Sequence, residues 1–185
     1  AAYGLAIMKS NWGNRISTFL LFSKLVPTIT IMIPLYIILD KVHLLGTYVG
    51  PILAHVSVNA PFVAWLVLGF IRDIPGDLFE AGKLDGCTRM QVFWKIVFPL
   101  LSPAIGSALL LVMQYSWNEL LFSMQYTNLH TYTLTVGVSR FVGAISVDWG
   151  QSSAAATIVL VPIIIAGFFL QKYLVSGLTA GAVKG

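Results

Sequence analysis

The chain has 185 residues, of which 57% are hydrophobic and only 10% charged, and its formal net charge is +4. An ordinary water-soluble domain has about 25% charged residues, so this composition indicates an integral membrane protein without a separate soluble domain. There is no basic run interleaved with aromatic residues, which excludes a nucleic-acid-binding surface.

Four apolar runs dominate the chain. They cover residues 25–39, 51–71, 100–122 and 153–171. The last three approach the ~20 residues that a membrane-crossing helix needs, and the first reaches this length if it extends back past Lys24. Several of the prolines lie inside these runs, where they either kink a helix for packing or take part in gating. We therefore expect an all-α, polytopic helical membrane protein with four transmembrane helices in a single domain, residues 1–185.

Basic residues are distributed unequally between the two sets of loops. With four spans, the segments 8–24, 72–99 and 172–185 lie on one side of the membrane and hold nine Lys and Arg residues, whereas 40–50 and 123–150 lie on the other and hold two. The positive-inside rule makes the first side cytosolic. We therefore expect a protein of the cytoplasmic membrane, with the 72–99 loop and the C-terminus in the cytosol and the 123–150 loop outside.

Residues 72–99 hold eight of the 18 formal charges of the chain. Within this loop Pro75-Gly76 marks a turn, and Asp77 followed by Glu80 is an acidic variant of the capping box, which predicts a helix with Asp77 as its N-cap. Gly86 lies where a left-handed residue would end that helix.

A second helix is expected to follow in the same loop. Thr88 and Gln91 repeat the capping-box spacing, and Pro99 limits the helix before the next apolar run. Such a helix pair is either a rigid lever pressed into another protein or an amphipathic element lying on the lipid surface.

The loop has a recognisable signature. Glu80-Ala81-Gly82, then Gly86, then Ile96 and Pro99, resembles the E-A-A, G, I-x-L-P pattern of the cytoplasmic loop in permease subunits of ATP-binding-cassette importers. Gly82 replaces the second alanine of that pattern, and Phe98 replaces its leucine.

Other segments resemble the smaller permease subunit of carbohydrate importers, the group that contains the maltose system. They are residues 27–36, 117–119, 148–150 and the ending GLTAGAVKG at 177–185. Members of this group usually have six spans. The chain would match the last four, so we expect that N-terminal spans are missing.

The resemblance implies partners and a role for the loop. The partners are a second homologous permease subunit, two ATPase subunits that hold ATP and magnesium, an extracytoplasmic solute-binding protein and the lipid bilayer. The chain contains no G-x-x-x-x-G-K-[ST] loop, so we expect no cofactor and no ATPase site in it. The resemblance assigns ATPase coupling to Asp77, Leu78, Phe79, Glu80, Ala81, Gly82, Asp85, Gly86, Ile96 and Pro99. Leu78, Phe79 and Ala81 would form an apolar anchor.

Five polar residues in or beside the spans are candidates for a translocation pathway: His55, Asn59, Gln114, Asn118 and Glu119. An acid within a span is a functional candidate, but Glu119 lies near the outer end and is equally explained as a hydrated structural acid. His55 and Asn59 either bind a solute or make hydrogen bonds between helices.

We therefore expect an importer subunit for a sugar, with glycerol phosphate or another polyol-like solute as the alternative. An intramembrane enzyme would need a nucleophile with a base, or a group of acids and histidines. The single cysteine and the scattered histidines provide neither such a site nor a set of metal ligands.

Overall fold

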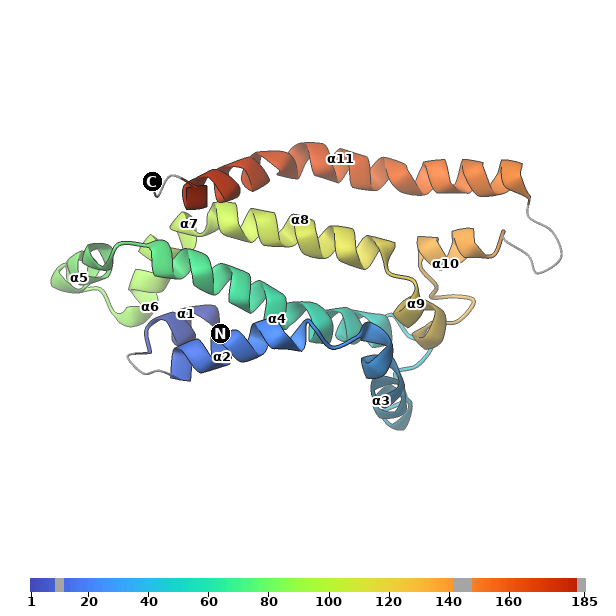
Figure 1. The fold of residues 1–185 in the computed structure, drawn as a ribbon, viewed down its shortest axis with the longest axis horizontal. Coiled ribbons are helices and arrows are strands. Elements are labelled where there is room, and N and C mark those ends of the chain that lie inside the picture. The colour runs from blue at the N-terminus through green and yellow to red at the C-terminus, as the bar shows by residue number, and fades with distance from the viewer. Residues whose placement is uncertain (9–11, 142–147, 183–185) are drawn as a thin grey trace. The chain divides into compact units, whose positions relative to one another are not determined.

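The computed structural model describes residues 1–8, 12–141 and 148–182, and every regular element in them is helical (Figure 1). The expected all-α fold is confirmed. The elements are α1 (Ala2–Ala6), α2 (Trp12–Ser23), α3 (Thr28–Lys41), α4 (Val49–Asp73), α5 (Gly76–Leu84), α6 (Arg89–Val92), the π-helical turn η1 (Phe93–Val97), α7 (Phe98–Leu100), α8 (Ser102–Asn118), α9 (Leu121–Tyr126), α10 (Leu134–Ser139) and α11 (Trp149–Ala182).

Each of the four apolar runs contains a helix, although the run 100–122 is broken between α8 and α9. By length and composition, α4 and the part of α11 from residue 149 to 169 are each able to cross a membrane alone. The pair α2 and α3, and the pair formed by residues 89–100 and α8, qualify only if each bent pair counts as one span. The described residues therefore provide two to four spans.

Apolar side chains predominate on the exposed surface of α11 between residues 154 and 169. Ile158, Ile164 and Phe169 are all exposed, and none of the residues in the most apolar stretch of this helix is buried within the chain. A helix that is hydrophobic on every side is stable in lipid or inside a larger bundle rather than in water. This surface is therefore suited to lipid or to a partner subunit.

The chain forms two compact units, each with its own core. Unit 1 consists of residues 1–25, 60–109 and 170–185, and unit 2 of residues 26–59 and 110–169. The core of unit 1 is formed by Ile71, Val92, Val97 and Leu101. The core of unit 2 is formed by Leu39, Ala54, Phe122 and Tyr126. The single transmembrane domain expected over residues 1–185 stays a prediction.

Some residues used in the sequence predictions are not described by the structure. Lys9 and Lys184 lie outside the described residues, as do residues 142–147 of the expected outer loop and the end of the GLTAGAVKG segment. The cytosolic C-terminus therefore stays a prediction.

Candidate functional site

Helix α5 begins two residues earlier than the sequence predicts. Its N-cap is Pro75, with φ −55° and ψ 134°, and the helix starts at Gly76 without a side-chain cap. The prediction that Asp77 is the N-cap is wrong, because the fixed φ and extended ψ of Pro75 already separate α5 from the preceding helix. Asp77 lies instead in the first turn, where its carboxylate is favoured by the helix dipole.

The end of α5 is a Schellman motif. Gly86 has a φ of +75°, which confirms the left-handed residue expected there. The Cys87 amide donates to the Gly82 carbonyl at 3.0 Å, and the Gly86 amide donates to the Lys83 carbonyl at 3.0 Å. These two bonds satisfy the carbonyls that a helix end leaves free, and they reverse the chain within three residues.

The second capping box forms as predicted. The Gln91 amide donates to Thr88 Oγ1 at 3.3 Å, and the Thr88 amide donates to Gln91 Oε1 at 2.8 Å. The helical segment then continues through η1 into α7, which contains Pro99. The helix therefore does not end at Pro99 but one residue later, at Leu100, and Pro103 has no amide hydrogen to donate to the Pro99 carbonyl.

Gly82 lies where the two helices of the loop approach each other closely. A Cβ at this position would lie 2.7 Å from Ile96 Cδ1 and 3.1 Å from Val92 Cγ2. Gly82 replaces the second alanine of the E-A-A pattern. Ile96, which belongs to the same pattern, lies too close to leave room for a Cβ there. Since Val92 and Val97 are in the core of unit 1, α5 is packed against buried residues and not free in solvent.

The outward surface of α5 differs from the predicted anchor. Leu78, Ala81 and Leu84 are exposed, and Leu84 is 88% exposed. Phe79 is half-buried and packs against the core of unit 1, so its expected place in the anchor is corrected. Leu84 was missed, although residues three apart along a helix lie near one another and the spacing of Leu78, Ala81 and Leu84 follows this rule.

Acidic side chains surround the exposed apolar residues of α5. Asp77, Glu80 and Asp85 are all exposed on the same nine-residue helix or at its C-cap. An apolar centre with a charged rim is the usual composition of a protein-binding surface. We refer to Leu78, Ala81 and Leu84 as the apolar stripe of α5.

Glu119 connects α8 to α9 in unit 2. It is 8% exposed, and its carboxylate accepts hydrogen bonds from the Phe122 amide at 2.9 Å and from the Ser123 amide at 3.3 Å. His55 Nε2 lies 3.9 Å from Glu119 Oε2. A carboxylate bound by backbone amides stabilises the start of a helix, so the contacts of Glu119 favour the structural alternative.

Three of the five candidate pathway residues line one shallow pocket. Gln114, Asn118 and Glu119, together with Leu111 and Tyr115, surround a space of about 390 Å³. Tyr115 was missed by the sequence analysis, although it shares a helix face with Leu111 and Asn118.

The other two candidate residues, His55 and Asn59, do not line this pocket. Asn59 is buried and donates to the His55 carbonyl at 2.9 Å, a bond within its own helix. The His55 ring lies edge-on to the rings of Tyr115 and Phe122. His55 therefore packs behind the residues of the pocket rather than among them.

Tyr126 anchors the end of α9 to α3. Its hydroxyl donates to the Met32 carbonyl at 2.6 Å. Burial of the phenol, and then the negative charge of Glu119, raise the pKa of Tyr126 to about 12. The phenol therefore keeps its proton at physiological pH and remains a hydrogen-bond donor.

Comparison with known proteins identifies relatives over the whole chain. The family model described as binding-protein-dependent transport system inner membrane component matches residues 1–180. The chain is 36% identical over its full length to a probable ABC transporter permease of Sinorhizobium fredii. It is 34% identical, again over its full length, to the trehalose/maltose transport system permease of Thermococcus litoralis. The chain is also 32% identical over its full length to the sulfoquinovosyl glycerol transport system permease of Agrobacterium fabrum. The chain spans 66%, 67% and 65% of the length of these three relatives.

Proposed function

Because this chain belongs to the family of inner-membrane components of binding-protein-dependent transport systems, we propose that it is a transmembrane subunit of an ATP-driven sugar importer. The solute, a mono- or oligosaccharide, crosses the cytoplasmic membrane by alternating access. Separate ATPase subunits bind ATP and magnesium. The names of the relatives support a sugar, since they specify trehalose/maltose and sulfoquinovosyl glycerol.

The shallow pocket of unit 2 favours a neutral solute over the alternative, glycerol phosphate. Its described lining combines one tyrosine with two amides and one carboxylate, and it contains no cationic side chain. An aromatic face and hydrogen-bonding groups suit the hydroxyls of a sugar. A phosphate would be repelled by Glu119.

The observation that carries the proposal is the packing of α5 against the core of unit 1. Its apolar stripe is exposed, whereas Gly82 and Phe79 on its other face pack against the segment that leads into α8. In the proposed complex the stripe fits a groove on an ATPase subunit, with Asp77, Glu80 and Asp85 at the rim. A packed helix moves as a unit, so closure of the two ATPase subunits is transmitted to the spans.

The proposed assembly contains four kinds of component around the lipid bilayer. This chain pairs with a second, homologous permease subunit, two ATPase subunits bind on the cytosolic side, and a solute-binding protein docks on the outside. Coupling requires that the 72–99 loop is cytosolic. The nine-to-two distribution of basic residues supports this orientation.

The orientation is tested with single cysteines in a Cys87→Ser background. Lys83→Cys lies on α5 and His130→Cys lies in the expected outer loop, and both native residues are exposed. In intact cells a membrane-impermeant thiol reagent should label His130→Cys but not Lys83→Cys, and permeabilised cells should label both. Labelling of Lys83→Cys in intact cells would contradict the orientation, and with it the coupling role of α5.

A further inference from the structure

A cavity of about 670 Å³ lies in unit 1, where α1 and the end of α4 meet α5 and α6. Ligand-binding sites for small molecules have volumes of about 300–1,000 Å³, so this cavity is large enough to hold one. Most of its lining is apolar and includes Ile7, Ile71, Ile74 and Phe79. The functional roles proposed above leave this space without a ligand.

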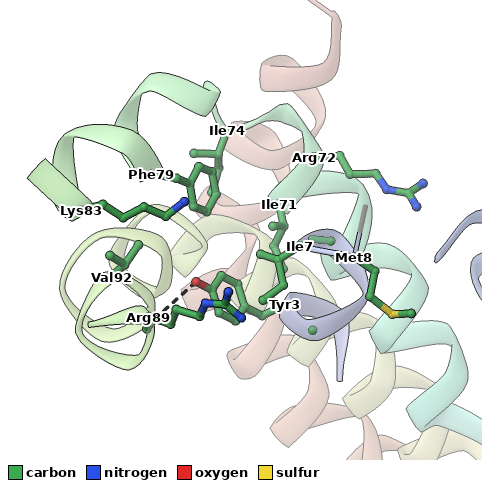
Figure 2. A pocket seen from close by; sticks show the side chains of 12 residues that line it. Tyr3, Ile7, Met8, Ile71, Arg72, Ile74, Phe79, Lys83, Arg89 and Val92 are labelled. Atoms are coloured by element: carbon green, nitrogen blue, oxygen red, sulfur yellow. Dashed lines mark hydrogen bonds between the residues drawn. The ribbon is translucent and has the colours of Figure 1, made fainter. Parts of the chain in front are cut away.

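The charged residues in the described lining of the cavity are all basic. They are Arg72, Lys83 and Arg89, and no acidic residue is among the lining residues that the structure describes. Figure 2 shows Lys83 and Arg89 at one end of the cavity and the Arg72 guanidinium at the other. Arg72 donates to Asn14 Oδ1 at 2.8 Å.

Among the described residues, no carboxylate neutralises Lys83 or Arg89. Within the part of the chain that the structure describes, neither head group forms an ion pair with a carboxylate. Two cations beside one cavity repel each other, and an anion between them removes this repulsion and gains charge-assisted hydrogen bonds. The end of the cavity formed by α5 and α6 therefore suits a phosphate group.

We propose that this cavity binds an anionic phospholipid of the cytosolic leaflet, with its phosphate at Lys83 and Arg89 and its acyl chain along Ile7, Ile71 and Ile74. The proposal rests on the orientation given under the proposed function. Basic pockets between membrane helices on the cytosolic side are known to bind anionic head groups. A free phosphate would use only the charged end and leave the apolar wall in contact with water, which favours the lipid.

Because of where the cavity lies, a lipid bound in it affects coupling to the ATPase. Lys83 belongs to α5 and Arg89 to α6, while Ile71 of the apolar wall belongs to α4, and Ile7 and Ile74 directly follow α1 and α4. A bound lipid therefore connects the two helices of the loop to the end of the preceding membrane helix. We expect it to hold α5 in place while the apolar stripe contacts an ATPase subunit.

The test counts lipids that remain bound to the purified protein. The full-length protein, in the assembly in which it is isolated, is placed in nanodiscs of phosphatidylcholine with a minority of phosphatidylglycerol, and retained phosphatidylglycerol is counted by native mass spectrometry. The double variant Lys83→Gln/Arg89→Gln removes both cations of the site. The control Arg15→Gln/Lys95→Gln removes two exposed cations of unit 1 that do not line the cavity.

A third variant tests the apolar part of the site without changing charge. Gly4 lines the cavity, and a Cβ at this position would meet no atom within 4 Å, so Gly4→Leu is expected to fill part of the space without displacing the backbone. We expect both Lys83→Gln/Arg89→Gln and Gly4→Leu to retain at least several-fold less phosphatidylglycerol than the wild type, and the control to retain the wild-type amount.

Three results would overturn the proposal. If Lys83→Gln/Arg89→Gln and its control retained equal amounts of phosphatidylglycerol, general attraction between charges would explain lipid binding without a site at these two residues. If Gly4→Leu retained the wild-type amount of phosphatidylglycerol, the acyl chain would not lie in this cavity. Displacement of phosphatidylglycerol by glycerol 1-phosphate would show that the charged end accepts a free phosphate-bearing solute. Retention is measured without sugar or ATP, so a failure of the proposed transport activity would be seen separately.

Discussion

Replacing Gly86 with valine is expected to abolish most sugar uptake while the protein still inserts into the membrane. Gly86 has a φ of +75°, and a Cβ there would meet no atom within 4 Å, so the strain would be entirely in the backbone. A left-handed conformation costs an ordinary residue about 1–2 kcal/mol, and a β-branched residue is a genuine outlier there. The Schellman motif would open, and α5 would leave its packed position.

The measurement is ATP-dependent uptake into cells or proteoliposomes, normalised to the amount of inserted protein. We expect a fall of roughly tenfold or more, since each 1.4 kcal/mol corresponds to a factor of ten. Gly76→Val is the matched control. Gly76 lies in the same loop, has equal room for a Cβ and no positive φ, so uptake should remain near the wild-type level. Wild-type uptake by Gly86→Val would refute the role of the helix end.

Replacing Leu84 with aspartate is expected to release the ATPase subunits. Leu84 is 88% exposed at the end of the apolar stripe, so the substitution should not disturb the core of unit 1. Truncating a central anchor of an interface commonly costs about 2 kcal/mol or more, and a buried charge adds to this cost. The affinity for the ATPase should therefore fall roughly thirtyfold or more.

Retention of the ATPase on the affinity-purified permease measures this effect. Leu129→Asp is the matched control, because Leu129 is 68% exposed and lies in the expected outer loop. It should retain the ATPase fully. Glu80→Ala should have a smaller effect than Leu84→Asp, since an exposed rim charge contributes only about 0–1 kcal/mol. Equal retention by Leu84→Asp and Leu129→Asp would exclude the apolar stripe as the ATPase contact.

The sequence predicts the features of the 72–99 loop that depend on local chemistry. The left-handed conformation of Gly86 and the Thr88–Gln91 capping box are set by residues close together in the chain, and the structure confirms both. The π-helical turn η1 and the half-buried position of Phe79 depend on packing between segments. The periodicity of α5 alone therefore does not distinguish its exposed face from its buried face.

The sequence also does not predict which of the candidate pathway residues lie close together. Polar residues within the spans can be found in the sequence, but His55 and Glu119 are 64 positions apart and only the fold places them 3.9 Å from each other. The bonds from Glu119 to the amides of α9 require a break after α8, which the continuous apolar run 100–122 conceals. From the sequence alone, a carboxylate that binds the amides of the next helix at such a break cannot be distinguished from an acid within a span.

Purification of the protein from its native membranes tests whether this chain transmits the action of a separate ATPase. The tagged full-length protein should be extracted in a mild detergent and its companions identified by mass spectrometry. We expect to find a second permease subunit together with an ATPase that contains a G-x-x-x-x-G-K-[ST] loop. Isolation of a folded, membrane-extracted protein without any such ATPase, under conditions that preserve a known complex of this kind, would contradict this role.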